Sequence, residues 1–340
     1  MKTAKFSMLF AGIARAHFAP KELIIDGNKY PARDARLDDY VGAMRIEWSY
    51  TDNQNFTWMA LNDVESQGIA CGNNPEAPPL KAVARAGADI TIQWTEMVEH
   101  HWGPSMTYLG AWSPGQSPQS VDFFKINDKG YDASQRLWAN ELIINNGFRD
   151  QLKLPSDIKP GLYILRTELL SLHGNGQTMN PGLKGLPQFY THCFNVEITG
   201  NGSVIPPGVR FPGGYAKNDP GVTFVLGTTS RYPSYPVPGP PVYEGAYDPP
   251  VGPKPVVTPE EVGTFPPNFE LQYQALLKQI TAFSDKAVDF FNGGGFSLTF
   301  FSRHEAEGKE LVKQRAELRQ EAIKLGLADP NEEMQNSEIF

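Results

Sequence analysis

Three of the six histidines stand in sequence contexts that are typical of a chemical site. His17 follows Ala14-Arg15-Ala16, His101 lies in "HHWGP", and His173 lies in "ELLSLHGNG". Imidazole is a frequent metal ligand, and it also exchanges protons near neutral pH. These three residues are therefore the first candidates for a metal or catalytic site.

The segment before His17 has the order of an export signal. Lys2 and Lys5 are followed by the apolar stretch "FSMLFAGIA" and then by the small-x-small pattern Ala14-Arg15-Ala16, after which a signal peptidase cuts. The segment is too short to span a bilayer. We expect residues 1–16 to be a signal peptide and His17 to be the first residue of a secreted, extracellular chain.

A histidine at the mature N-terminus offers two nitrogen donors, the α-amine and a ring nitrogen. One further imidazole would give three nitrogens in a T-shaped plane, and amine and imidazole nitrogens in tetragonal geometry favour copper(II). The further ring could come from His100 or from His101, and the residues alone do not separate the two.

A second cluster of polar residues lies in "QFYTHCF". Strand alternation would put Gln188, Tyr190 and His192 on one face and Cys193 on the other. Cys71 and Cys193 are the two cysteines of the chain, and in an exported protein we expect them to form one disulfide. The chain-entropy model gives such a long loop a stabilisation of about 4 to 5 kcal/mol.

Charge and hydropathy exclude two classes of partner. The formal net charge is −8, and removal of Lys2, Lys5 and Arg15 with the signal would make it more negative, which argues against nucleic acid. Beyond the signal, no apolar run approaches the roughly 18 to 20 residues of a membrane helix. We expect a soluble monomer that binds neither nucleic acid nor membrane.

The elements that must position these residues read as strands. Short β-type runs occur between residues 17 and 230 and are separated by Gly, Pro and Asn. They include "ELIID", "ADITIQW", "VDFFKIN", "GLYILRTELLSLH" and "FNVEITG". Strands at this spacing without amphipathic helices between them predict an all-β fold. The expected architecture is an antiparallel β-sandwich, immunoglobulin-like or fibronectin-like, with long loops.

The composition changes after this region. The Pro-dense stretch "YPSYPVPGPPVYEGAYDPPVGPKPVVTPEEVGTFPP" cannot be a central strand or a helix and is predicted to be extended. We expect residues 246–268 to be a linker and 269–340 to be a partly helical or disordered extension. Helical spacing covers 269–291, and a charged helical stretch covers 305–325. The extension carries no recognisable chemistry; partner binding or surface anchoring is the alternative to a passive appendage.

Across nearly all of residues 17–245 the chain resembles the fungal lytic polysaccharide monooxygenases of auxiliary activity family nine, formerly glycoside hydrolase family 61. The motifs occur in the order of that family. Besides the N-terminal histidine they are "DGNKYP", "IACG", "VARAGADITIQW", "HWGPSMTYL", "FFKI", "IKPGLYILRTELLSLH", "QFYTHCFNVEITG", "VRFPGGYAKNDPGV" and "SYPVPGPPVYEG".

The resemblance implies a set of site residues. A histidine brace would consist of the amine and ring of His17 together with the ring of His101, which is preferred over its neighbour because the family's ligand precedes x-Gly-Pro by one place. Tyr190 would occupy the axial position of the copper. Gln188 and His173 would hydrogen-bond an oxygen species at the metal, a role typical of outer-shell donors.

The resemblance also implies the reaction. Copper, reduced by an external electron donor and supplied with dioxygen or hydrogen peroxide, would oxidise carbon 1 or carbon 4 of a glycosidic linkage in cellulose or hemicellulose. The substrate face would be flat, with exposed aromatic rings that stack on sugars. Tyr235 matches the family's surface tyrosine, with core packing as its alternative. Trp102 and Tyr40 are weaker candidates.

Other readings of the same residues are a non-catalytic copper-binding or copper-delivery protein and a carbohydrate-binding module. No motif presents the two carboxylates that glycoside hydrolysis requires. Two sequons, at Asn55 and Asn201, permit glycosylation in a secreted protein.

Overall fold

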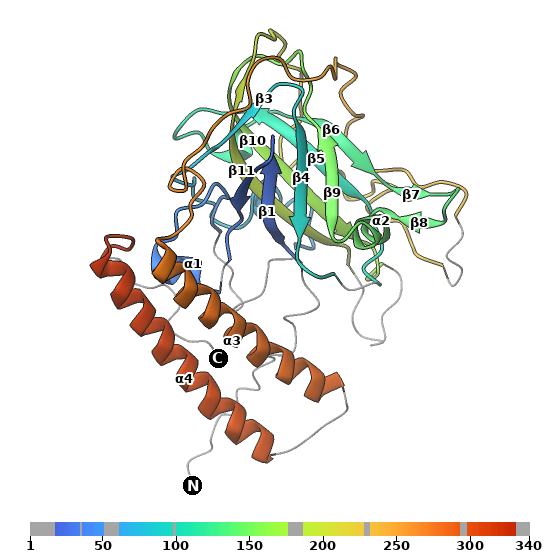
Figure 1. Ribbon diagram of the computed structural model, residues 1–340. Coiled ribbons are helices and arrows are strands. Elements are labelled where there is room, and N and C mark those ends of the chain that lie inside the picture. The colour runs from blue at the N-terminus through green and yellow to red at the C-terminus, as the bar shows by residue number, and fades with distance from the viewer. Residues whose placement is uncertain are drawn as a thin grey trace.

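The computed structural model consists of two β-sheets packed face to face, with a helical hairpin at one end (Figure 1). The sandwich confirms the predicted fold class. The structure describes residues 18–34, 36–50, 61–97, 100–175, 186–227, 232–292 and 298–330. The predicted site residue His17 and the sequon residue Asn55 lie outside these ranges.

One sheet has four antiparallel strands in the order β2-β1-β4-β9. The strands are β1 (Pro20–Ile25), β2 (Asn28–Pro31), β4 (Asp89–Trp94) and β9 (Arg149–Lys153). Buried and more exposed residues alternate along β1, β4 and β9, because one face packs on the core and the other faces solvent.

The other sheet has five strands in the order β3-β11-β10-β5-β6, antiparallel except for the pair of β3 and β11. The strands are β3 (Ala82–Arg85), β5 (Ser105–Ala111), β6 (Phe123–Lys129), β10 (Gly161–Ser171) and β11 (Gln188–Thr199). β10 and β11 are buried on both faces. Consecutive residues of these two strands are therefore buried, whereas buried and more exposed residues alternate in the first sheet.

Side chains of β11 divide between two hydrophobic clusters. Tyr190 and Phe194 belong to the core between the sheets. Phe189 and Cys193 point to the opposite face, which loops cover. The predicted alternation along this strand is confirmed.

The remaining short elements lie in the connections. They are α1 (Asp38–Val41), η2 (Gln67–Ile69), η3 (Pro118–Ser120), β7 (Tyr131–Asp132), β8 (Leu137–Trp138) and α2 (Ala139–Asn145). β7 and β8 form a separate two-stranded ribbon.

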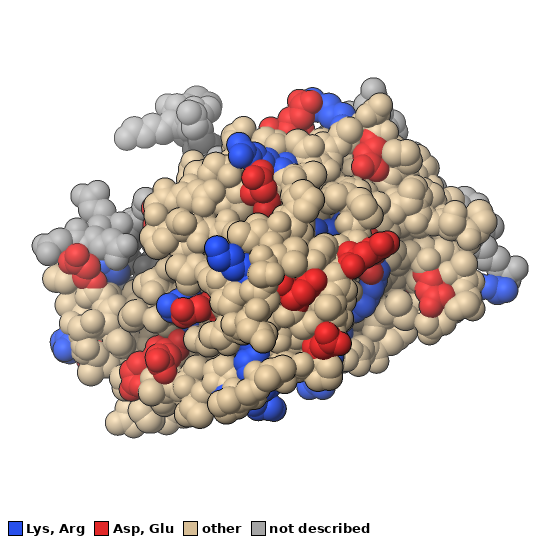
Figure 2. Space-filling model, turned by 90° about the horizontal axis from the view of Figure 1, so that it is seen from above, with Lys and Arg blue, Asp and Glu red and all other residues tan. Residues whose placement is uncertain are grey.

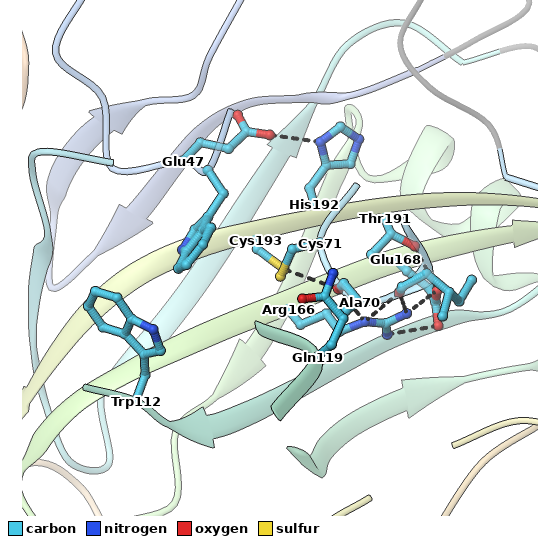
Figure 3. Close-up of a disulfide and its surroundings, with 12 residues drawn as sticks. Glu47, Ala70, Cys71, Trp112, Gln119, Arg166, Glu168, Thr191, His192 and Cys193 are labelled. Atoms are coloured by element: carbon cyan, nitrogen blue, oxygen red, sulfur yellow. Dashed lines mark hydrogen bonds and ion pairs between the residues drawn. A yellow bond between two sulfur atoms is a disulfide. The ribbon is translucent and has the colours of Figure 1, made fainter. Parts of the chain in front are cut away.

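The predicted disulfide is present between Cys71 and Cys193, with a Cα–Cα distance of 5.4 Å (Figure 3). Beside it, the buried guanidinium of Arg166 donates hydrogen bonds to the carbonyl of Ala70 and to the carboxylate of Glu168. The disulfide and these bonds fasten the segment after η2 onto the outer face of the five-stranded sheet.

The Pro-rich segment is extended, as predicted, and it lies against the sandwich. Arg85 in β3 donates to the carbonyl of Gly252 at 2.5 Å, and Asn28 in β2 donates to that of Pro255 at 3.0 Å. The segment is therefore attached along its length, so it does not act as a free spacer.

The C-terminal extension forms two long helices, α3 (Pro267–Asn292) and α4 (Leu298–Lys324), which lie side by side (Figure 1). Both predicted helices are confirmed, and α3 begins two residues before the predicted start of the extension at residue 269. Leu37 and Val41, at α1, share one hydrophobic cluster with residues of both helices. Among the described helices, none is long and apolar enough to cross a membrane.

Candidate functional site

Three strands of the five-stranded sheet bring the predicted site residues to one edge of the sheet, where β10 ends and β5 and β11 begin. Ser171, the last residue of β10, pairs with Gln188, the first residue of β11. Two residues earlier, Leu169 pairs with Tyr190 on β11 and with Ser105, the first residue of β5. Because β10 runs antiparallel to both neighbours, residues just after its end meet residues just before the starts of β5 and β11.

A backbone contact places His101 beside β10. Leu172, which follows β10, donates its N–H to the carbonyl of Trp102 at 2.8 Å. At Gly103 a Cβ atom would lie 1.7 Å from the carbonyl oxygen of Leu170. Only glycine allows this approach, which gives a physical reason for the Gly in the His-x-Gly-Pro motif.

The rings at this edge are in contact. The His101 and His173 ring centroids lie 4.2 Å apart at 40°. Tyr190 lies 6.3 Å from His101, and Phe18 lies 4.1 Å from Tyr190 and 5.7 Å from His101. Two histidines, a tyrosine and the residue that follows His17 therefore form one cluster.

His100 is exposed, and its ring is nearly perpendicular to that of Trp102, with the ring centroids 5.8 Å apart. His101 is half-buried in the cluster. The neighbouring histidines thus differ in their surroundings, and this difference favours His101 as the metal ligand.

Tyr190 is a buried phenol with a defined hydrogen bond. Its hydroxyl donates to Oε1 of the half-buried Gln188 at 2.6 Å. Burial raises the pKa of Tyr190 far above its ordinary value, so the phenol stays protonated at neutral pH. This bond fixes which end of the Gln188 amide faces Tyr190. The NH₂ group at the other end of the amide can donate to another partner.

His173 is half-buried, and burial lowers its pKa. Its ring is therefore neutral at neutral pH. The Nδ1 atom lies 2.7 Å from the hydroxyl of Ser171.

His192 belongs to a separate contact. Its Nδ1 atom is 2.8 Å from a carboxylate oxygen of Glu47 (Figure 3). The His192 ring also packs against Trp94. His192 shares a strand face with Tyr190 but is a core residue paired with a carboxylate.

Among the residues that the structure describes, no group of three or more His, Cys, Asp or Glu side chains could hold a metal ion. His17, which the brace requires, lies outside them, while its neighbour Phe18 contacts His101 and Tyr190. Phe18, which directly follows His17 in the sequence, thus belongs to the cluster.

The prediction that Tyr235 presents an exposed ring is wrong. Tyr235 is 8% exposed, its ring packs edge-on against Trp138, and its hydroxyl donates to the carbonyl of Gly221 at 2.7 Å. A ring surrounded in this way has no free face for a sugar. Tyr235 is therefore a core residue, which was the alternative expectation. Trp102, beside His101, is half-buried.

Two residues of the cluster, Phe18 and Ser171, were not predicted from the sequence. Ser171 precedes His173 by two places at a strand end, a spacing that puts two side chains on one side, so "SLH" carried a usable signal. Phe18 had no signal beyond its place after His17.

The sequon at Asn201 lies in the exposed turn after β11. This position is accessible to modification, and glycosylation there stays a prediction.

The face seen in Figure 2 carries acidic and basic side chains interspersed, with neither sign gathered into a continuous patch. On this face there is no basic surface of the kind that phosphate backbones require.

The profile of Auxiliary Activity family 9 (formerly GH61) matches residues 17–235. AA9 family lytic polysaccharide monooxygenase A of Geotrichum candidum is 36% identical over 246 residues, which cover 71% of this chain and 81% of that protein. AA9 family lytic polysaccharide monooxygenase F of Malbranchea cinnamomea is 32% identical over 244 residues, covering 70% and 96%.

Among solved structures, the extended catalytic domain of H. jecorina LPMO9A is similar, with a TM-score of 0.59 and 28% identity. The match covers 71% of this chain and 96% of that domain. Nearly the whole of that domain is thus matched by about seven tenths of the present chain.

Proposed function

The chain belongs to Auxiliary Activity family 9 and is an enzyme of the lytic polysaccharide monooxygenase type, and we propose that it uses one copper ion to oxidise glycosidic bonds. The substrate would be cellulose or a related β-1,4-glucan, attacked at carbon 1, carbon 4 or both. The observation that carries the proposal is the cluster of His101, His173, Gln188 and Tyr190 beside Phe18.

The donor set fits copper. His101 would supply one imidazole nitrogen, and His17, freed by cleavage after Ala16, would supply its amine and ring. Amine and imidazole nitrogens suit copper(II), which also leads the affinity order of the divalent first-row metals. Copper bound there would supply the one-electron chemistry that activates dioxygen or hydrogen peroxide toward a C–H bond.

Tyr190 would lie beside the copper as a neutral phenol. Burial keeps its proton on, and that proton is donated to Gln188, so the residue offers no phenolate. A neutral phenol would leave the nitrogens of His17 and His101 to hold the copper.

Gln188 and His173 would act on the co-substrate as hydrogen-bond donors. The Gln188 amide is oriented by the bond from Tyr190 to its oxygen, which leaves its NH₂ group to donate. His173 is neutral, because burial lowers its pKa. Both side chains would hold an oxygen species in place without adding charge.

The polysaccharide would bind across the strand edge that carries His101. Trp102, half-buried and next to His101, is the aromatic residue we assign to the substrate face in place of Tyr235. An aromatic ring offers a sugar its apolar face while its polar edge stays wet.

The decisive experiment is product analysis with the copper-loaded mature protein, ascorbate and phosphoric-acid-swollen cellulose. We expect soluble oxidised oligosaccharides, with aldonic acids reporting oxidation at carbon 1 and ketone-bearing ends reporting carbon 4. Treatment with EDTA should abolish them, and stoichiometric copper should restore them. Tight copper binding without oxidised sugars from any glucan would favour copper delivery; cellulose binding without copper binding would favour a carbohydrate-binding module.

His101→Ala should abolish the products and weaken copper binding, measured by calorimetry. The matched control is His100→Ala, which removes the exposed neighbouring ring. We expect this control to keep wild-type affinity and products. The reverse result would move the ligand to His100.

Secretion and processing form part of the proposal. N-terminal sequencing of the secreted protein should begin at His17. A variant with Gly-Ser before His17 lacks the free amine on His17, and we expect its copper affinity to fall by at least about 100-fold, beyond the usual loss for an outer-shell partner. Wild-type affinity in that variant would rule out the brace.

A further inference from the structure

Ser171 is a fully buried hydroxyl at the end of β10, and it has a direct bond to the site. Its Oγ atom lies 2.7 Å from Nδ1 of His173. It also pairs across the sheet with Gln188, so the strand register fixes its position. The proposed function gives Ser171 no role.

Proton accounting determines the direction of this bond. A neutral imidazole carries a proton on one nitrogen and a lone pair on the other, while a hydroxyl can both donate and accept. Within the described part of the chain, His173 is the side chain that the Ser171 hydroxyl contacts. A buried hydroxyl proton left without an acceptor destabilises the fold, because the hydroxyl has given up its hydrogen bonds to water.

Donation from Ser171 to Nδ1 avoids this destabilisation. Nδ1 then holds the lone pair, and the ring proton of His173 lies on Nε2. The opposite arrangement, with the proton on Nδ1, would leave the hydroxyl hydrogen of Ser171 unused in a buried position. The geometry therefore favours one tautomer.

We propose that Ser171 is a positioning residue that fixes the Nε2–H tautomer and the ring orientation of His173. The Nε2–H group is then a ready donor for the oxygen co-substrate. This role rests on the proposed function, because only an oxygen species at the site would use that donor. The tautomer itself is a property of the chain and can be measured without metal.

Three variants separate this role from a general loss of packing. Ser171→Ala removes the hydroxyl and keeps the strand. Ser171→Thr restores a hydroxyl at the same position. Thr167→Val is the matched control, since Thr167 is also buried in β10 and its hydroxyl contacts Thr107, while its partner across the sheet is His192 and not His173.

The test is nitrogen NMR of the metal-free protein labelled with ¹⁵N-histidine, at about pH 8, above the ordinary histidine pKa of about 6.5. The His173 signals are assigned by their loss in His173→Gln. We expect the Nε2–H tautomer in wild type and Ser171→Thr, unchanged His173 signals in Thr167→Val, and a shift toward the Nδ1–H tautomer in Ser171→Ala. An Nδ1–H tautomer in wild type, or no change in Ser171→Ala, would overturn the proposal.

A second measurement connects the tautomer to the reaction. Ser171→Ala should lower the turnover number on a soluble cello-oligosaccharide on the order of 10-fold, the lower end for a lost outer-shell partner. Its KM and copper affinity should be unchanged, and Ser171→Thr should recover most of the turnover. A changed tautomer with full turnover would contradict the positioning role. If the tautomers follow the expected pattern and no variant oxidises any glucan, the proposed function fails and the tautomer assignment stands.

Discussion

At the scale of single residues, burial decides the protonation of the groups beside His101. It raises the pKa of the Tyr190 phenol and lowers that of the His173 imidazole, so both side chains are neutral near pH 7. Within the described part of the chain, Tyr190 is oriented by its hydrogen bond to Gln188 and His173 by its bond with Ser171. Both bonds join neutral side chains.

Tyr190→Phe tests the first of these bonds. Loss of the hydroxyl removes the donor to Gln188 and frees its amide to rotate, so we expect initial oxidation rates to fall on the order of 10-fold. The free energy of unfolding should decrease by about 1 kcal/mol, as for one lost hydrogen bond. Product formation and urea denaturation measure the two effects.

The matched control is Tyr235→Phe, which removes a buried hydroxyl bonded to the Gly221 carbonyl, away from the histidine cluster. We expect a similar loss of stability with an unchanged oxidation rate. Equal rates in wild type and Tyr190→Phe would show that the bond to Gln188 does not matter for the reaction.

At the scale of elements, strand register and strand ends create the site. The antiparallel pairing of β10 with β5 and β11 brings His173 to His101 and Ser171 to Gln188.

On the other sheet the β1–β2 turn has a structural role. Asp26 in that turn forms two bonds with Arg85 of β3, at 2.7 and 3.0 Å, and Arg85 also holds the Pro-rich segment through Gly252.

The hydrogen bond from Arg85 holds the pKa of Asp26 below its ordinary value of 3.8. A carboxyl with a lower pKa in the folded state stabilises the fold fully above its unfolded pKa, and this contribution is lost as the pH falls through the folded pKa. We therefore expect the stability difference between wild type and Asp26→Asn to be constant above about pH 5 and to shrink below pH 3.8.

Urea denaturation at a series of pH values measures this difference. Asp89→Asn is the control, because that carboxylate is 84% exposed with Lys153 at 3.8 Å, and we expect a stability difference from wild type below about 1 kcal/mol there. A difference for Asp26→Asn that persists unchanged to the lowest pH would contradict the assignment.

At the scale of the whole molecule, the C-terminal hairpin is part of the fold. Tyr273 of α3 donates to Asp38 of α1 at 2.6 Å. Arg45 pairs with the same carboxylate at 3.0 Å and donates to the carbonyl of Gly263 at 2.5 Å. This buried group, together with the shared hydrophobic cluster, joins the hairpin, the Pro-rich segment and the sandwich.

Arg45→Met tests the junction. It leaves Asp38 buried without its cation, and breaking a buried pair in this way costs about 3 to 5 kcal/mol. We expect that loss in the free energy of unfolding, measured by urea denaturation with the copper site unloaded. The control Arg210→Met removes an exposed pair with Asp122, where the Arg210 side chain is 59% exposed, and should cost below about 1 kcal/mol. Equal small losses in both variants would mean that the pair of Arg45 and Asp38 does not stabilise this junction.

The sequence by itself determined the strand runs, the two long helices, the disulfide and the motif order that identifies the family. These features are encoded locally, through side-chain periodicity, cysteine count and short motifs. The tertiary structure decided the different surroundings of His100 and His101, the burial of Tyr235 and the attachment of the hairpin. Each of these depends on which distant segment covers a residue, and a pattern along one strand or helix carries no information about the surface that packs against it.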